Sequence, residues 1–184
     1  KRSILLFLIA QFFWWLGLGA VIPFVTILMK EYYGIDISQF LRLSPLAVLA
    51  AALMVFFVVL SGILGDRWGH RWVITSGLFI LTLGWVIAYF VHSLWAIYLI
   101  GALIAVGAST LINEPLAFLA ELVPKGREGE FYGLDTLSIT ASQAPAALLG
   151  GEVIDWFGYS YIFLFAAVGL AIATVFMLIE RDTV

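Results

Sequence analysis

The stretch Ser61–Trp72, SGILGDRWGHRW, places an aspartate, two arginines and a histidine among glycines in an otherwise apolar region. Asp66 could accept hydrogen bonds from the N-terminus of a neighbouring helix, where the macrodipole is positive. Arg67 and Arg71 could pair with acids from another turn, and Glu121 is the candidate acid. The pattern predicts a charged latch that holds one conformation closed and breaks in another. An ordinary turn with membrane-anchoring basic residues is the alternative interpretation.

Glu114 is an ionisable group inside a long apolar run, where a charge is costly and usually functional. It lies about ten residues, or ~15 Å along a helix, from Pro124. Asn113 and Pro115 flank it, and Pro115 cannot donate a hydrogen bond to the carbonyl of Leu111. We therefore expect a broken helix with an acid that binds an ion or a proton. A neutral Glu114 bonded to that carbonyl or to another helix is the alternative.

Two predicted helices carry further polar faces. Gln11, Trp14 and Trp15 share one face by their spacing, and an amide beside indole rings could bind an amphipathic solute. Packing is the alternative role for these tryptophans. At 100° per residue, a second face is formed by Asp135, Thr136, Ser138, Thr140, Ser142 and Gln143, for which cavity lining and helix packing both remain open. The candidates for binding substrate or coupling ion are thus Glu114, Gln11, Trp15, Asn113, Asp135 and Gln143.

Composition places these side chains in a membrane. The 184 residues are 64% hydrophobic and 11% charged, whereas about a quarter of a soluble domain is charged. About 20 apolar residues cross the hydrocarbon core as a helix. Six segments qualify, namely Ile4–Met29, Pro45–Leu64, Trp72–Val91, Leu94–Leu122, Phe131–Ile154 and Ser160–Ile179. Because lipid offers the backbone no hydrogen-bond partners, we predict an all-α, polytopic membrane protein with one bundle of six transmembrane helices.

Basic residues predict the orientation of the bundle. Seven of the nine lie on the side that both termini share, and only Lys30 and Arg42 lie on the other. We therefore expect cytoplasmic termini and a cytoplasmic turn at Ser61–Trp72, in a plasma membrane or bacterial inner membrane. The start at Lys1, without a methionine or a small-residue cleavage site, indicates the first span of a fragment rather than a signal peptide.

The chain also contains an internal repeat. The pattern G-x-x-x-D-x-x-G at Gly62–Gly69 returns 89 positions later at Gly151–Gly158. The chain then divides into two three-helix units, 1–92 and 93–184. An odd number of helices inverts the second unit in the membrane, a symmetry common in secondary transporters. Coincidence is the alternative, since few positions match.

Gly62-x-Leu64-x-Asp66-Arg67-x-Gly69-x-Arg71 resembles the signature loop of the major facilitator superfamily, glycine-x-leucine-x-aspartate-arginine-x-glycine-arginine-lysine. His70 and Arg71 stand where the family usually has its closing arginine–lysine pair. The stretches Leu122–Gly133 and Gly151–Tyr159 resemble the family's loops after the fourth helix and before the sixth helix of a half. The resemblance covers the whole chain.

The resemblance implies one six-helix half of a transporter that usually has twelve spans, with the substrate cavity between its halves. The N-terminal half typically has an arginine in its fourth helix, and Leu94–Asn113 has no basic residue. Ala144–Gly151 only approximates the antiporter signature of the fifth helix. Both absences favour the C-terminal half.

The resemblance further implies a secondary active transporter that moves a small solute by alternating access with ion or proton coupling. The loop 123–133 is similar to that of sugar–cation symporters, which does not identify a solute. The expected latch residues are Gly62, Asp66, Arg67, Gly69, Arg71 and Glu121. The expected partners are the lipid bilayer, the solute, and the other half or a second copy of this chain. A non-transporting scaffold or assembly subunit on the same half-fold, which could be homodimeric, is the alternative.

Other classes of function lack their residues. The chain has no nucleophile–histidine–acid set and no histidines at metal-ligand spacing, so we expect neither an enzyme nor a metal site. It has no phosphate-binding glycine loop, and we expect no cofactor. The net charge of −3 argues against nucleic acid as a partner.

Overall fold

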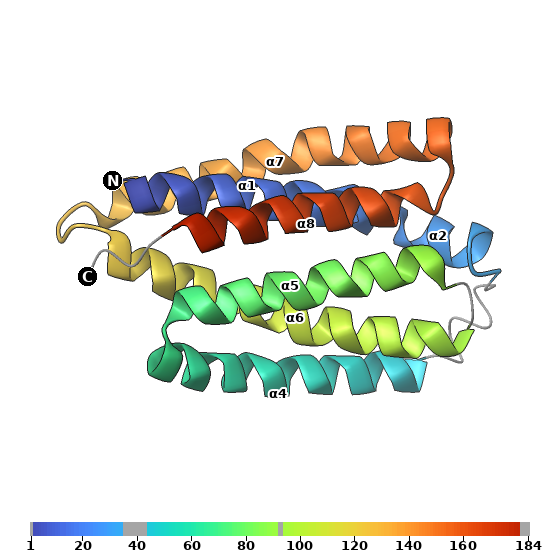
Figure 1. Cartoon of the computed structure of the whole chain (residues 1–184), viewed down its shortest axis with the longest axis horizontal. Coiled ribbons are helices and arrows are strands. Elements are labelled where there is room, and N and C mark those ends of the chain that lie inside the picture. Colours follow the sequence, from blue (N-terminus) through green and yellow to red (C-terminus); the bar gives the residue numbers. More distant parts are fainter. Residues whose placement is uncertain (1, 35–43, 92–93, 181–184) are drawn as a thin grey trace.

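The computed structural model describes residues 2–34, 44–91 and 94–180, which are helical apart from short turns. The elements are α1 (Arg2–Val21), the 3-10 turn η1 (Ile22–Phe24), α2 (Val25–Glu31), α4 (Ser44–Trp68), α5 (His70–Phe90), α6 (Leu94–Leu122), α7 (Glu128–Phe157) and α8 (Tyr161–Ile179) (Figure 1). The prediction of an all-α bundle is confirmed.

Each of the six predicted spans corresponds to a helix, with α1, η1 and α2 together forming the first. Among the described residues, five helical stretches are long and apolar enough to cross a membrane: Arg2–Glu31, Ala51–Trp68, His70–Phe90, Leu99–Leu122 and Tyr161–Ile179. The sixth helix, α7, has 30 residues but carries the predicted polar face. Its length suits a membrane span, and its polar side chains lower its hydropathy below that of the others.

Prolines have different effects in the first and fourth spans. At Pro23 the α-helix gives way to the 3-10 turn η1, which begins at Ile22. The predicted break at Pro115 is wrong, because α6 runs without interruption from Leu94 to Leu122. Proline removes a single donor, and a helix in a membrane tolerates this loss where neighbouring groups surround it. Pro115 is buried in the bundle.

The helices pack in layers (Figure 1). Helix α7 lies beside α1 on one side of the bundle, and α8 and α5 lie in the middle. Helix α4 lies next to α6 on the far side. The most extensive contacts join α1 to α8, α5 to α6, α1 to α7 and α5 to α8. The same pattern of packing results if α1 is exchanged with α6, α4 with α7, and α5 with α8. The pair α1–α8 then replaces α6–α5, and α1–α7 replaces α6–α4.

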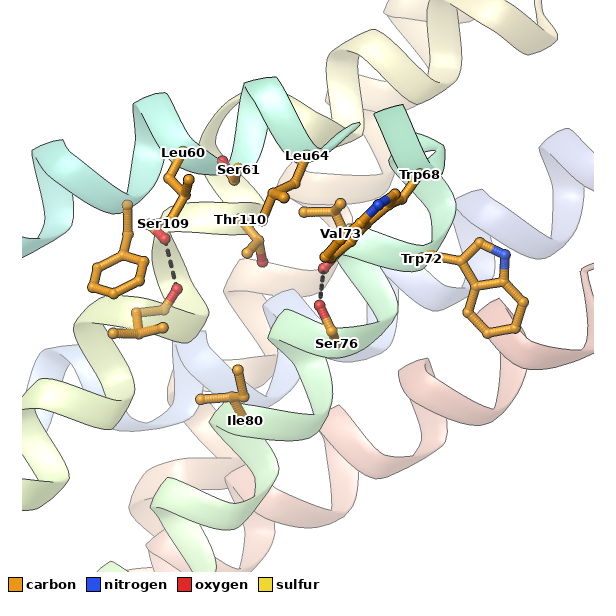
Figure 2. A pocket seen from close by; sticks show the side chains of 12 residues that line it. Leu60, Ser61, Leu64, Trp68, Trp72, Val73, Ser76, Ile80, Ser109 and Thr110 are labelled. Carbon is orange, nitrogen blue, oxygen red and sulfur yellow. Dashed lines mark hydrogen bonds between the residues drawn. The ribbon is translucent and has the colours of Figure 1, made fainter. Parts of the chain in front are cut away.

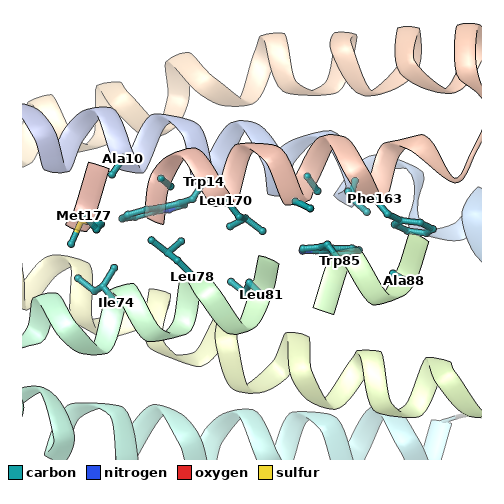
Figure 3. Close-up of a cluster of buried hydrophobic side chains, with 14 of the residues drawn as sticks. Ala10, Trp14, Ile74, Leu78, Leu81, Trp85, Ala88, Phe163, Leu170 and Met177 are labelled. Atoms are coloured by element: carbon teal, nitrogen blue, oxygen red, sulfur yellow. The ribbon is translucent and has the colours of Figure 1, made fainter. Parts of the chain in front are cut away.

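The core lies between α1, α8 and α5, where Trp14, Leu78 and Leu170 are buried (Figure 3). Small residues let the helix backbones approach closely there. A Cβ on Gly17 of α1 would lie 2.8 Å from the carbonyl oxygen of Ala166 on α8. Such close approach by small residues is the usual means of packing helices in lipid, where hydrophobicity does not drive them together.

The two turns that contain the repeated motif share a backbone conformation. Gly69, between α4 and α5, has φ 90°, and Gly158, after α7, has φ 98°. Only glycine adopts such values without strain, which explains the glycine at the end of each motif. The α4–α5 turn lies at the end of the bundle where α1 begins and α8 ends, and the α7–α8 turn lies at the opposite end (Figure 1).

Candidate functional site

The structure joins the buried acid and the charged turn into one cluster. Glu114 on α6 is 1% exposed, and its Oε2 lies 2.7 Å from Nδ1 of His70, the first residue of α5. The other ring nitrogen, Nε2, lies 3.5 Å from Oε1 of Glu121 and 3.9 Å from Oδ1 of Asp66. Carboxylates from α4 and α6 therefore face both nitrogens of one imidazole.

The helix α4 passes close to this pair at Gly65. A Cβ on Gly65 would overlap both Nδ1 of His70 and Oε2 of Glu114. Glycine at this position therefore gives the pair its space. In the sequence His70 stands in place of an arginine of the family motif, and neither His70 nor Gly65 is among the predicted site residues.

Arg71 has a different acid partner from the one predicted. Its Nε donates to the carbonyl of Met177 at 2.9 Å and its Nη2 to that of Leu178 at 3.0 Å, at the end of α8. Its Nε lies 3.3 Å from Oε2 of Glu180. The prediction of an Arg71–Glu121 pair is therefore wrong in this structure. Because successive residues of a helix point about 100° apart, His70 faces α6 while Arg71 faces α8.

The arginine contacts also suit the end of a helix electrostatically. The last carbonyls of α8 carry partial negative charge, which a guanidinium stabilises. Arg71 also lies over the ring of Trp72, 4.8 Å from its centroid. It is buried by these contacts, and it fixes the start of α5 to the end of α8.

The remaining residues of the predicted latch lie at the surface of the described part of the chain. Asp66 and Arg67 are exposed, and a Cβ on Gly62 would meet no atom within 4 Å. Among the described residues, no group of three or more histidine and acidic side chains could hold a metal ion. The cluster around His70 consists of one imidazole and three carboxyl groups.

Two of the weaker candidates meet in a second place. The buried amide of Gln11 on α1 lies beside the half-buried carboxyl of Asp135 on α7. Within the described residues, Oε1 of Gln11 and Nε1 of the buried Trp14 have no hydrogen-bond partner. Trp15 is half-buried. These residues form a polar position between α1 and α7.

Other polar side chains of the predicted site have structural contacts or are exposed. Ser138 donates to the carbonyl of Leu8 at 2.9 Å and so joins α7 to α1. Asn113 and Gln143 are exposed, and the structure does not add them to either cluster. The predicted candidates therefore separate into Glu114 with its cluster, Gln11 beside Asp135, the half-buried Trp15, and two surface residues, Asn113 and Gln143.

A pocket of about 260 Å³ lies between α4, α5 and α6 (Figure 2). Its lining includes Leu60, Leu64, Trp68 and Ile80. The lining hydroxyls donate to carbonyls three residues earlier in their own helices, at Ser61, Ser76, Ser109 and Thr110. The pocket therefore offers apolar contact, and none of the predicted substrate-binding residues lines it.

The loop between α6 and α7 is ordered by its own acids. The backbone N–H of Gly126 donates to Oε1 of Glu128 at 3.0 Å, and this bond lowers the pKa of the Glu128 carboxyl. Arg127 pairs with Glu130 at 2.7 Å. Negative charge in the first turn of α7 also suits its N-terminus.

Long apolar helices, with one buried acid paired to a histidine, define a multi-pass integral membrane protein. The sequence model of the Major Facilitator Superfamily matches residues 7–184. The chain therefore belongs to the major facilitator superfamily, a family of transporters and not of enzymes. The resemblance stated from the motifs is confirmed.

Individual relatives agree with this membership. The chain is 28% identical to the uncharacterized MFS-type transporter YxiO of Bacillus subtilis, over 72% of this chain and 30% of the relative. It is 27% identical to the riboflavin transporter RibZ of Clostridioides difficile, over 79% of this chain and 31% of the relative. It is 26% identical to the multi-drug resistance efflux pump PmrA homolog of Lactococcus lactis, over 95% of this chain and 43% of the relative.

A solved structure shows the same fold. The crystal structure of the POT family transporter PepTSo matches 98% of this chain and 37% of its own chain with a TM-score of 0.84, at 20% identity. The chain thus spans less than half the length of these relatives, which is consistent with one half of such a transporter.

Proposed function

We propose that the chain is one six-helix half of a secondary active transporter that moves a small solute by alternating access, coupled to an ion or a proton. The observation that carries this proposal is the contact between Glu114 and His70. It links a buried acid to the charged turn at one end of the bundle. Transport by alternating access requires such a link between a binding group and an element that moves.

Other parts of the proposal concern architecture. The exchangeable packing of the two helix triplets and the matched glycine turns support two inverted repeats, 1–92 and 93–184. The share of each relative that the chain covers supports a partner in the form of the other half or a second copy. Assignment to the C-terminal half stays a prediction. The relatives named for an activity are transporters or pumps, so we do not pursue a scaffold.

The relatives' names provide the first solutes to test. One is named for riboflavin, another for multi-drug efflux, and a tetracycline resistance protein of Escherichia coli is 26% identical over 82% of this chain. Riboflavin and tetracycline are both ring systems with polar substituents, and they differ in charge and shape. We therefore propose riboflavin and tetracycline as probes rather than as substrates.

The test measures uptake of both probes into proteoliposomes that contain the complete polypeptide, with an imposed proton gradient. We expect Glu114→Gln to lower gradient-driven uptake by about tenfold or more, because it removes the group that ionises. Glu152→Gln, at an exposed acid of α7, is the matched control and should transport like the parent. Gradient-driven uptake that is unchanged in Glu114→Gln would contradict the proposal. The direction of proton flow separates symport from exchange.

A further inference from the structure

The imidazole of His70 has carboxylate oxygens at both ring nitrogens. Glu114 of α6 lies at Nδ1, and Glu121 of α6 and Asp66 of α4 lie at Nε2. A neutral imidazole has one N–H and one lone pair. In the neutral ring, one nitrogen would therefore present its lone pair to a carboxylate oxygen. In the doubly protonated ring, Nδ1–H donates to Glu114 and the positive charge also faces Glu121, whose Oε1 lies 3.5 Å from Nε2.

The surroundings of His70 make the second proton on its ring important for neutralising Glu114. Glu114 is buried, so loss of the positive charge beside it would leave a carboxylate without a counter-charge in a medium that solvates it poorly. No other cation in the described part of the chain is positioned to replace His70. Arg71 is turned toward Glu180 and the end of α8, and Arg67 is exposed. The neutralisation of Glu114 thus depends on the protonation of one ring, or on protonation of Glu114 itself.

The contacts of the ring also connect three helices. His70 begins α5, Asp66 is in the last turn of α4, and Glu114 and Glu121 are on α6. Gly65 keeps α4 close enough for the pair to fit beneath it. A protonated ring therefore attracts α4 and α6 toward the start of α5. A deprotonated ring loses this attraction and leaves the acids to repel each other.

We infer that the His70–Glu114 pair is a proton-binding site whose loading holds the ends of α4, α5 and α6 together. This inference builds on the proposed function, in which the bound proton is the coupled ion. Imidazole is suited to the task because it changes charge between about pH 5 and pH 8. The attraction requires the doubly protonated ring and is absent when the ring is neutral.

The experiment measures the distance between α4 and α6 without any solute. The chain has no cysteine, so spin labels can be attached to Ile63→Cys on α4 and Leu116→Cys on α6, which are both exposed. Cysteines elsewhere in the complete polypeptide are replaced. Distances are recorded by double electron–electron resonance in lipid nanodiscs at a series of pH values. ¹⁵N NMR follows the ring of His70, whose signals are assigned by their loss in His70→Arg.

We expect the short-distance population of the parent to fall by about half or more as the pH rises through the range of imidazole titration. In His70→Arg, which is permanently charged, the short distance should persist at every pH. In Glu114→Gln the distance should not depend on this titration, while size-exclusion profiles show that the variants are folded. The NMR signals of His70 should change over the same pH range as the distance.

A distance in the parent that does not change with pH would overturn the inference. The inference would also be overturned if the distance in His70→Arg still depended on pH. It would be overturned equally if the distance in the parent changed with pH while the NMR signals of His70 did not. These outcomes are separate from those for the proposed function. A protein that transports with a pH-independent distance refutes only the proton site, and a protein with the expected distances that moves no solute refutes only the transporter.

Discussion

Glu114 imposes the strictest physical requirement on its neighbours, because a buried carboxylate must be paired or neutral. His70 meets this requirement at 2.7 Å, and Gly65 of α4 supplies the space for both side chains. Arg71, the next residue along, has a separate role at the end of α8. Two adjacent residues of one turn thus connect α5 to two different neighbours.

The space at Gly65 leads to a prediction about stability. In Gly65→Ala the new methyl group overlaps the His70–Glu114 pair, so we expect a loss of about 1–3 kcal/mol in the free energy of unfolding. Gly62→Ala is the control, because a methyl group there meets no atom within 4 Å. Thermal unfolding in detergent micelles measures both. Equal melting temperatures for the two variants would show that the pair does not need this space.

The sequence predicts Glu114 and misses its partner for a physical reason. An acid in an apolar run is recognisable locally, since the run itself predicts that the acid is buried in the membrane. The contact with His70 joins residues 44 positions apart, and it depends on how α5 packs on α6. The motif directs attention to Arg67 and Arg71. The residue that contacts the buried Glu114 is His70, where this chain departs from the motif.

At the scale of elements, close backbone contact holds the helices together. In Gly77→Ala of α5, the added methyl group would overlap the side chain of Thr110 and lie 3.0 Å from the carbonyl oxygen of Gly107 on α6. We expect a loss of about 1–3 kcal/mol in the free energy of unfolding. Gly101→Ala, in open space on α6, should cause little change. Denaturant titration followed by tryptophan fluorescence compares the two, and equal midpoints would show that α5 and α6 do not depend on this contact.

Helix positions follow from hydropathy more closely than helix shape does. Runs of about 20 apolar residues have the length that a bilayer requires, and the six predicted spans match the observed helices. The effect of a proline depends on what surrounds it. Pro23 accompanies a 3-10 turn, whereas Pro115 lies inside a continuous helix. The sequence shows that each lacks a donor, but the packing decides whether the helix continues.

At the scale of the whole molecule, the distribution of charge predicts the orientation of the bundle. The α4–α5 turn, rich in basic residues, lies at one end and the α7–α8 turn at the other (Figure 1). We expect Trp156→Cys to react with a membrane-impermeant thiol reagent in intact cells, and Trp68→Cys to react only after permeabilisation. Both positions suit the test, being 77% and 69% exposed. The reverse pattern of labelling would invert the predicted topology.

The choice of neighbouring helices is the part of the fold that the sequence predicts least. Helices that are apolar on every side give no direction in which to pack, because lipid and protein are similar environments for such side chains. The glycines identify surfaces of close approach only after the partners are known. The repeated motif is an exception, since its two copies predict that equivalent helices pack equivalently.

The account as a whole is tested most directly by the pH dependence of probe uptake in the complete polypeptide and its Glu114→Gln and His70→Arg variants, measured in parallel. We expect the uptake rate of the parent to vary across about pH 5 to pH 8, where imidazole titrates. Glu114→Gln should show no gradient-driven uptake, and His70→Arg should show a profile without this dependence. One pH profile shared by all three proteins would contradict the account, because transport would then not depend on the buried pair.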